Sequence, residues 1–122
     1  MTTNSNDPRL RKIQEDGQQE IYLVLSEEER AKGYVHPVRY AYEHLACGSV
    51  TTTDEDIAET YARDPKFYVR TMCTSCGSHF NLRLRGGAPA FVWEEDGAPV
   101  GEERMSLLIG VLRALFRIRP SP

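Results

Sequence analysis

The sequence predicts a small α+β domain with an antiparallel sheet and few helices. Short runs of alternating apolar and polar residues, which are typical of strands, recur between residues 20 and 93. Two pairs of soft side chains lie on turns between such runs, His44 with Cys47 and Cys73 with Cys76. A helical pattern separates the pairs, and a more apolar one follows the last strand. These features predict a sheet that carries ligands on its turns, with one helix inserted and one appended.

The composition limits the class of protein. At 122 residues and 40% hydrophobic content, the chain suits one domain with a modest core. Its net charge of −3 argues against a protein that coats nucleic acid by charge alone. The odd number of cysteines, 3, fits reduced thiols better than a secreted disulfide framework. The polar start predicts no signal peptide, and no apolar run reaches the roughly 18–20 residues that span a bilayer.

The first third of the chain begins with an arm and a strand. Residues 1 to 18 are polar and lack hydrophobic periodicity, which predicts a flexible N-terminal arm. Residues 20 to 25 are β-branched, aromatic and aliphatic, and they predict a first strand. Ser26 and Glu29 have the spacing of a capping box, so we expect a short helix that ends before Gly33.

A second strand is predicted over residues 35 to 43. Pro37 belongs at its beginning or edge, because proline cannot donate a hydrogen bond to a sheet. Alternation along this strand places His44 on the same side as Tyr42, at the point where the strand ends. A ligand in that position is held rigidly by the sheet.

A helix is predicted between the two ligand pairs. The carboxylates of residues 54 to 56 favour the positive end of a helix dipole, and an apolar stripe follows over residues 57 to 62. Asp64 precedes Pro65, and residues before proline avoid helical backbone, so the helix ends there.

Three further strands are predicted over residues 67 to 73, 80 to 84 and 91 to 93, with glycine turns after the last two. The first of them delivers Cys73 to the second turn. Strand, ligand turn and strand form the outline of a zinc ribbon. The sequence therefore predicts a zinc-ribbon-like domain over residues 19 to 103, to which the helix is an addition.

The C-terminal segment, residues 104 to 119, predicts an apolar helix. Its polar positions, Ser106, Gly110, Arg113 and Arg117, fall on one narrow stripe, and nearly every other side is apolar. One small domain hardly covers so many apolar faces. We therefore expect an association helix that docks on a second copy, on a different protein or on a membrane surface.

The two ligand pairs predict a zinc site formed by His44, Cys47, Cys73 and Cys76. Zinc prefers four tetrahedral ligands drawn from cysteine sulfur and histidine nitrogen. The glycine behind each pair can adopt positive φ, which turns backbone N–H groups toward a thiolate. Four protein ligands leave the ion no open position, so the expected site is structural and its binding energy is folding energy.

Several alternatives to this site follow from the same residues. His79 stands at ligand spacing behind Cys76 and is able to replace His44. The pair Cys73 and Cys76 is also the spacing of a thiol redox motif, although no βαβ pattern accompanies it. If no metal binds, the same four residues are expected to be small buried thiols and a histidine of the core. Glu43 directly precedes His44, so the H-x-E signature of zinc deaminases is absent.

The stretches CGSVTTTDEDIAETYARDPKFY, CTSCGSHF and FVWEEDGAPVG resemble a group of small uncharacterised zinc-ribbon-like proteins predicted in bacteriophage genomes, many from phages of actinobacteria. The resemblance covers about residues 20 to 101 and leaves out the apolar C-terminal segment. It implies a phage-encoded protein that acts in the cytoplasm of a bacterial host, with the virion as the alternative place. It implies no activity.

The sequence thus favours a non-enzymatic, zinc-stabilised module that binds a protein partner, or itself, through residues 104 to 119. The alternative is a nucleic-acid-binding zinc ribbon. Its candidate contacts are Arg70, Arg83, Arg85, Arg113, Arg117 and Arg119.

Overall fold

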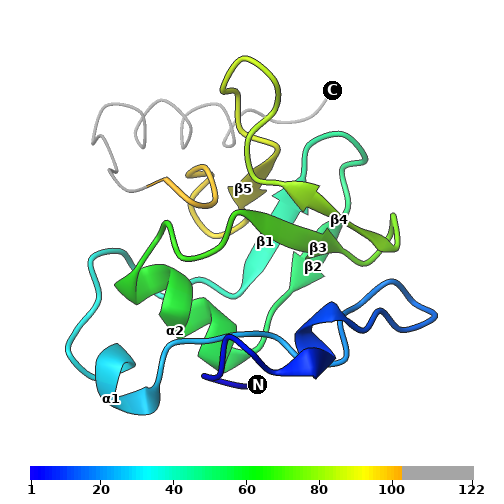
Figure 1. Ribbon diagram of the computed structural model, residues 1–122. Coiled ribbons are helices and arrows are strands. Elements are labelled where there is room, and N and C mark those ends of the chain that lie inside the picture. The colour runs from blue at the N-terminus through cyan, green and yellow to red at the C-terminus, as the bar shows by residue number, and fades with distance from the viewer. Residues whose placement is uncertain (103–122) are drawn as a thin grey trace.

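The computed structural model describes residues 1 to 102, so the apolar helix expected over residues 104 to 119 lies outside the described residues. The elements in chain order are η1 (Pro8–Arg11), α1 (Glu27–Arg30), β1 (Ala41–His44), β2 (Val50–Thr52), α2 (Glu55–Arg63), β3 (Arg70–Cys73), β4 (Ser78–Asn81) and β5 (Phe91–Trp93) (Figure 1). They confirm the α+β class with small antiparallel sheets. In this part of the chain no helix is long and apolar enough to cross a membrane.

The strands form two antiparallel sheets, one of three strands in the order β2-β1-β5 and one of two strands, β3-β4. The ligand turns join β1 to β2 and β3 to β4, so each belongs to a hairpin. In the larger sheet Tyr42 pairs with Trp93, and His44 pairs with Phe91. The register therefore carries the core aromatics and the first ligand on neighbouring strands.

The helix α2 lies between the two hairpins in the sequence, as predicted. Asp54 is its N-cap and Asp64, which precedes Pro65, is its C-cap. Its buried face presents Ala58, Tyr61 and neighbouring small residues to the core. In Figure 1 the short helix α1 lies beside it. Arg30 links the two helices, because its Nη1 is 3.1 Å from Asp56 and 2.6 Å from Glu59.

The helix α1 begins as the capping-box spacing predicts. The Ser26 hydroxyl accepts a hydrogen bond from the Glu29 N–H at 3.1 Å. The helix is a single turn that ends at Arg30.

Residues 20 to 25 form no strand, contrary to the prediction. The segment bridges only to Thr2, whose N–H donates to the Tyr22 carbonyl at 2.9 Å. Side chains satisfy other backbone groups here, because the Tyr68 hydroxyl donates to the Leu23 carbonyl and the Leu25 N–H donates to Thr60 Oγ1. The segment is thus joined to α2 and to the residues before β3 by side-chain hydrogen bonds, without entering a sheet.

The strand predicted over residues 35 to 43 is shorter in the structure and begins at Ala41. Side chains that follow β5 in the sequence bind the residues that precede β1. The Glu95 carboxylate accepts from the Tyr40 N–H at 2.6 Å, and Asp96 pairs with Arg39 at 3.1 Å. β2 is not among the predicted strands; the turn after His44 brings its residues into pairing with β1.

The N-terminal arm predicted to be loose has a definite path in the structure. η1 is capped by Asp7, whose side chain accepts from the Arg9 N–H. Residues 13 and 19 form a bridge, and the turn between them places Gly17 against Gly77. A Cβ on Gly17 would lie 1.9 Å from the Gly77 carbonyl oxygen. Backbone and polar contacts hold this segment to the domain. Such contacts produce no hydrophobic periodicity in the sequence, so the pattern did not predict an ordered segment.

The core lies between α2, β5 and the two hairpins. Its buried cluster contains Tyr42, Tyr61, Cys73, Leu82, Ala90, Phe91, Trp93, Ala98 and Val100. Edge-to-face aromatic contacts link its members. The Tyr61 and Trp93 rings, for example, have an interplanar angle of 85° and centroids 5.2 Å apart. Cys73 belongs both to this core and to the second ligand turn.

Candidate metal centre

The two ligand turns are built in the same way. Gly48 and Gly77 have φ of +73° and +67°, as the trailing-glycine pattern predicts. The Gly48 N–H donates to the His44 carbonyl at 2.7 Å, and the Gly77 N–H donates to the Cys73 carbonyl at 2.9 Å. Each turn therefore closes on the residue that carries its first ligand, and this directs both ligands of the pair to one side.

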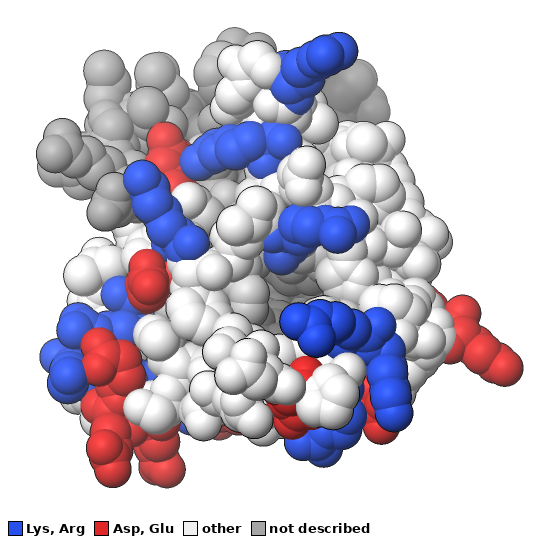
Figure 2. Space-filling model, viewed as in Figure 1, with Lys and Arg blue, Asp and Glu red and all other residues white. Residues whose placement is uncertain are grey.

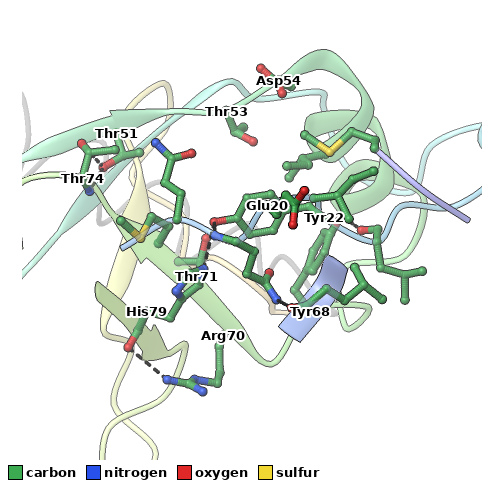
Figure 3. Close-up of a pocket in the computed structure, with 18 of the residues that line it drawn as sticks. Glu20, Tyr22, Thr51, Thr53, Asp54, Tyr68, Arg70, Thr71, Thr74 and His79 are labelled. Carbon is green, nitrogen blue, oxygen red and sulfur yellow. Dashed lines mark hydrogen bonds between the residues drawn. The ribbon is translucent and has the colours of Figure 1, made fainter. Parts of the chain in front are cut away.

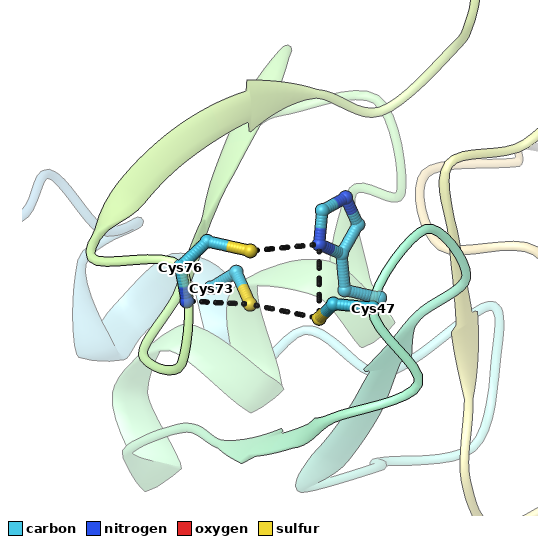
Figure 4. Close-up of side chains that lie close together, drawn as sticks. Cys47, Cys73 and Cys76 are labelled. Carbon is cyan, nitrogen blue, oxygen red and sulfur yellow. Dashed lines mark hydrogen bonds between the residues drawn. The ribbon is translucent and has the colours of Figure 1, made fainter.

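The structure brings the four predicted ligands together. The donor atoms of His44, Cys47, Cys73 and Cys76 all lie within 4.8 Å of one another. His44 Nδ1 is 3.4 Å from Cys47 Sγ and 3.6 Å from Cys76 Sγ, and the sulfurs of Cys47 and Cys73 are 3.6 Å apart. Figure 4 shows the three sulfurs converging with the ring nitrogen.

These separations fit the edges of a zinc tetrahedron. Zinc bonds of about 2.3 Å to sulfur and about 2.0–2.1 Å to nitrogen require S···S edges of about 3.8 Å and S···N edges of about 3.5 Å. The three separations of 3.4 to 3.6 Å come within a few tenths of an ångström of those values. One histidine and three thiols are also a donor set that zinc prefers. The cluster is therefore compatible with zinc.

Two aromatic rings from different sheets fix the His44 imidazole. The Phe91 ring stacks on it at 20° with a centroid separation of 4.6 Å, and the Phe80 ring lies 4.5 Å away on β4. His44 is 4% exposed, so this packing excludes water from the ring and aims Nδ1 at the sulfurs. Sequence reasoning missed both phenylalanines as positioning residues. The cross-strand pairing of His44 with Phe91 is not visible in a linear pattern.

The thiols differ in their surroundings. Cys73 is buried, whereas Cys47 and Cys76 are exposed. The backbone N–H of Ser49 is the main cause that lowers the pKa of Cys47 to about 6. The hydrogen bond with Cys73 is the main cause that raises the pKa of Cys76 to about 11. Without a cation the thiolate is thus favoured at Cys47 and disfavoured at Cys76, while a divalent ion favours deprotonation of its sulfur ligands.

The other histidines lie outside the cluster. The Tyr22 hydroxyl is 2.9 Å from His79 Nε2, and burial, followed by the charge of Arg70, lowers the pKa of His79. Strand alternation explains the placement, because His79 precedes Phe80 and points to the opposite face of β4. His36 is buried near the end of α2, where its N–H donates to the Ala62 carbonyl.

No protein-family model, curated protein or solved structure matches this chain. The case for the site therefore depends on its own geometry and donor chemistry.

Proposed function

We propose that this chain is a non-enzymatic binding module whose fold is stabilised by one zinc ion. His44, Cys47, Cys73 and Cys76 would hold the ion between the two hairpins, in the manner of a zinc ribbon with α2 inserted. The observation that carries the proposal is the convergence of the four donor atoms, all within 4.8 Å of one another. With four protein ligands, zinc has no open position for a substrate or an activated water.

The surroundings of the cluster support a structural role for the ion. Residues 45 to 48 and 74 to 77 are exposed, so apolar packing does not hold the turns in place. A metal that joins the two turns would supply the missing constraint, and small domains use structural metals in this way.

The binding partner is part of the same proposal. Residues 104 to 119, which lie outside the described residues, would associate with a second copy or with a different protein through their apolar faces. The resemblance to phage proteins supports a place of action in the bacterial cytoplasm, with the virion as the alternative.

The metal is tested by its content per chain in protein purified under reducing conditions. We expect one zinc per chain in the wild type and in His79→Ala, and a lost or weakened site in His44→Ala. His79→Ala is the matched control, because it removes the same side chain at a position outside the cluster, where His79 contacts Tyr22. A well-folded wild type without metal would overturn the proposal and favour thiol redox chemistry at Cys73 and Cys76.

Association is tested separately by the concentration dependence of the molecular mass. Leu112→Glu or Leu115→Glu is expected to abolish self-association while the zinc content stays unchanged. A wild-type chain that is monomeric at all concentrations and captures no protein would contradict this part of the proposal.

A further inference from the structure

The basic residues divide into a paired and an unpaired set. Within residues 1 to 102, ion pairs with carboxylates engage Arg9, Arg30, Lys32, Arg39 and Arg63. No carboxylate in that range pairs with the cations that we call the cationic face, which are Arg11, Lys12, Arg70, Arg83 and Arg85. Arg70 Nη2 donates to the His79 carbonyl at 3.2 Å, but this neutral partner does not cancel its charge. Cations without a carboxylate partner keep their attraction for an external anion, although the whole chain is acidic.

A cavity of about 520 Å³ lies between the N-terminal segment, α2 and the strands β2, β3 and β4. Arg70 lines one wall of the cavity. Leu10 and Ile13 line another, so the exposed Arg11 and Lys12 stand between two lining residues. In Figure 2, Lys and Arg side chains stand on both sides of a hollow. Positive charge therefore flanks the entrance.

The interior of the cavity suits a planar polar group. Tyr22, Tyr68 and His79 contribute rings, and Thr71 contributes a hydroxyl (Figure 3). The Tyr22 oxygen accepts from the Gln19 N–H at 3.2 Å and lies 2.9 Å from His79 Nε2. Burial lowers the pKa of His79 and so favours a neutral imidazole on this wall.

Two carboxylates also line the cavity. Asp54 lies at the far end from Arg70 in Figure 3, and Glu20 lies between them. Inside the cavity they oppose a phosphate, but a carboxylate accepts a hydrogen bond from the exocyclic amine of a base. The charges therefore place an anion outside, near Arg70, and a neutral base inside.

We infer that the cationic face binds single-stranded nucleic acid, with phosphates at the arginines and one unpaired base in the cavity beside Tyr22 and His79. Single-strand binders combine a positive groove with aromatic rings on which bases stack. The volume of about 520 Å³ falls within the roughly 300–1,000 Å³ typical of small-ligand pockets. A duplex offers no unstacked base, and an acidic peptide or membrane offers none either.

This inference uses the proposed function only for its scaffold, since the ligand turn between β3 and β4 holds both Arg70 and His79 in place. It does not require self-association. The nucleic-acid surface and the segment from 104 to 119 are separate parts of the chain, so each can fail alone.

The test is fluorescence anisotropy of labelled, mixed-sequence 12-nucleotide RNA and DNA strands with the zinc-loaded full chain. We expect the affinity to fall steeply with salt and to drop at least tenfold in the double variant Arg70→Glu, Arg83→Glu. Lys32→Glu is the control for a charge reversal away from the cavity, at an exposed position just after α1. It reverses one charge where the double variant reverses two, so the losses are compared per reversed charge. It should change the affinity less than twofold.

The base is tested with Tyr22→Ala, which should weaken single-strand binding about tenfold through lost stacking and leave weak duplex binding unchanged. Zinc content and circular dichroism of every variant establish that it is folded, and Leu112→Glu should bind like the wild type. Equal losses in the arginine and Lys32 variants would overturn the inference. So would equal affinity for duplex, or binding to anionic phosphatidylserine vesicles without binding to either oligonucleotide.

Discussion

Two regions of the molecule are held together by different chemistry. Around α2 and β5, large side chains such as Phe91 and Trp93 are almost completely buried. The tips of the two hairpins, residues 45 to 48 and 74 to 77, are exposed along their whole length. The first region is stabilised by apolar burial, whereas the second has four soft donor atoms directed at one point.

Comparison of the two regions shows how a short chain can hold two hairpins in fixed positions relative to each other. A domain of this size buries too little surface to pack every turn, so a shared ion can replace core contacts where the chain is most exposed. His44 and Cys73 join the regions, since both are buried and both carry donor atoms of the cluster. Changes at the junction should therefore affect both regions, and changes away from it only one.

The largest effect is expected from removing the metal. Structural zinc contributes about 10–16 kcal/mol in zinc-finger peptides, which matches or exceeds the ~5–15 kcal/mol total stability of ordinary domains. A chelator should therefore unfold the hairpin tips and lower the thermal midpoint sharply, and added zinc should restore both. Circular dichroism and amide NMR spectra measure this. An unchanged midpoint after complete metal removal would show that the apolar region alone is sufficient.

Core truncation at the junction should come next. Phe91→Ala and Trp93→Ala each remove a nearly fully buried aromatic and should cost about 3–5 kcal/mol in denaturant unfolding. Of these two residues only Phe91 contacts the His44 ring, so Phe91→Ala but not Trp93→Ala should also weaken zinc binding in competition with a chelating dye. Equal zinc affinity in the two variants would separate the core from the metal site.

A smaller effect is expected where the N-terminal segment meets the second ligand turn. Gly17→Ala would place a Cβ 1.9 Å from the Gly77 oxygen, whereas Gly33→Ala meets no atom within 4 Å. Both glycines have positive φ, so both variants should lose about 1–2 kcal/mol through backbone strain. Gly17→Ala should lose more than Gly33→Ala, because the Gly77 backbone must also move. Only Gly17→Ala should also shift the amide resonances of residues 74 to 78. Identical spectra there would mean that the segment does not constrain the turn.

The smallest effect concerns η1, which neither the core nor the ligands hold. The Arg9 guanidinium, with hydrogen bonds of 3.0 and 2.6 Å, lowers the pKa of Asp7 to about 2. Because this lies below the ordinary value of about 3.9, the contribution to stability is complete above pH 4 and is lost as the pH falls through about 2.

An NMR titration of the Asp7 carboxyl measures this pKa, and Arg9→Gln should return it toward about 3.9. A carboxyl that titrates at its ordinary value in the wild type would show that the pair does not persist in solution.

Features that depend on neighbouring residues could be predicted from the sequence alone. Ligand spacing with a glycine behind it predicted two turns with positive φ, and both Gly48 and Gly77 have it. The acidic residues 54 to 56 and Pro65 located α2, and alternation placed His44 at the end of a strand. Such signals act over a few residues, so they survive without knowledge of the fold.

Features that depend on contacts between distant segments became visible only in the tertiary structure. The register of β4 turned Phe80 toward His44 and His79 toward Tyr22, so His44 joined the three cysteines. Residues 20 to 25 carry strand-forming side chains but found hydrogen-bond partners on Thr2 and on side chains. Strand pairing and ring packing join residues far apart in sequence, and their free energies depend on which partners the fold supplies.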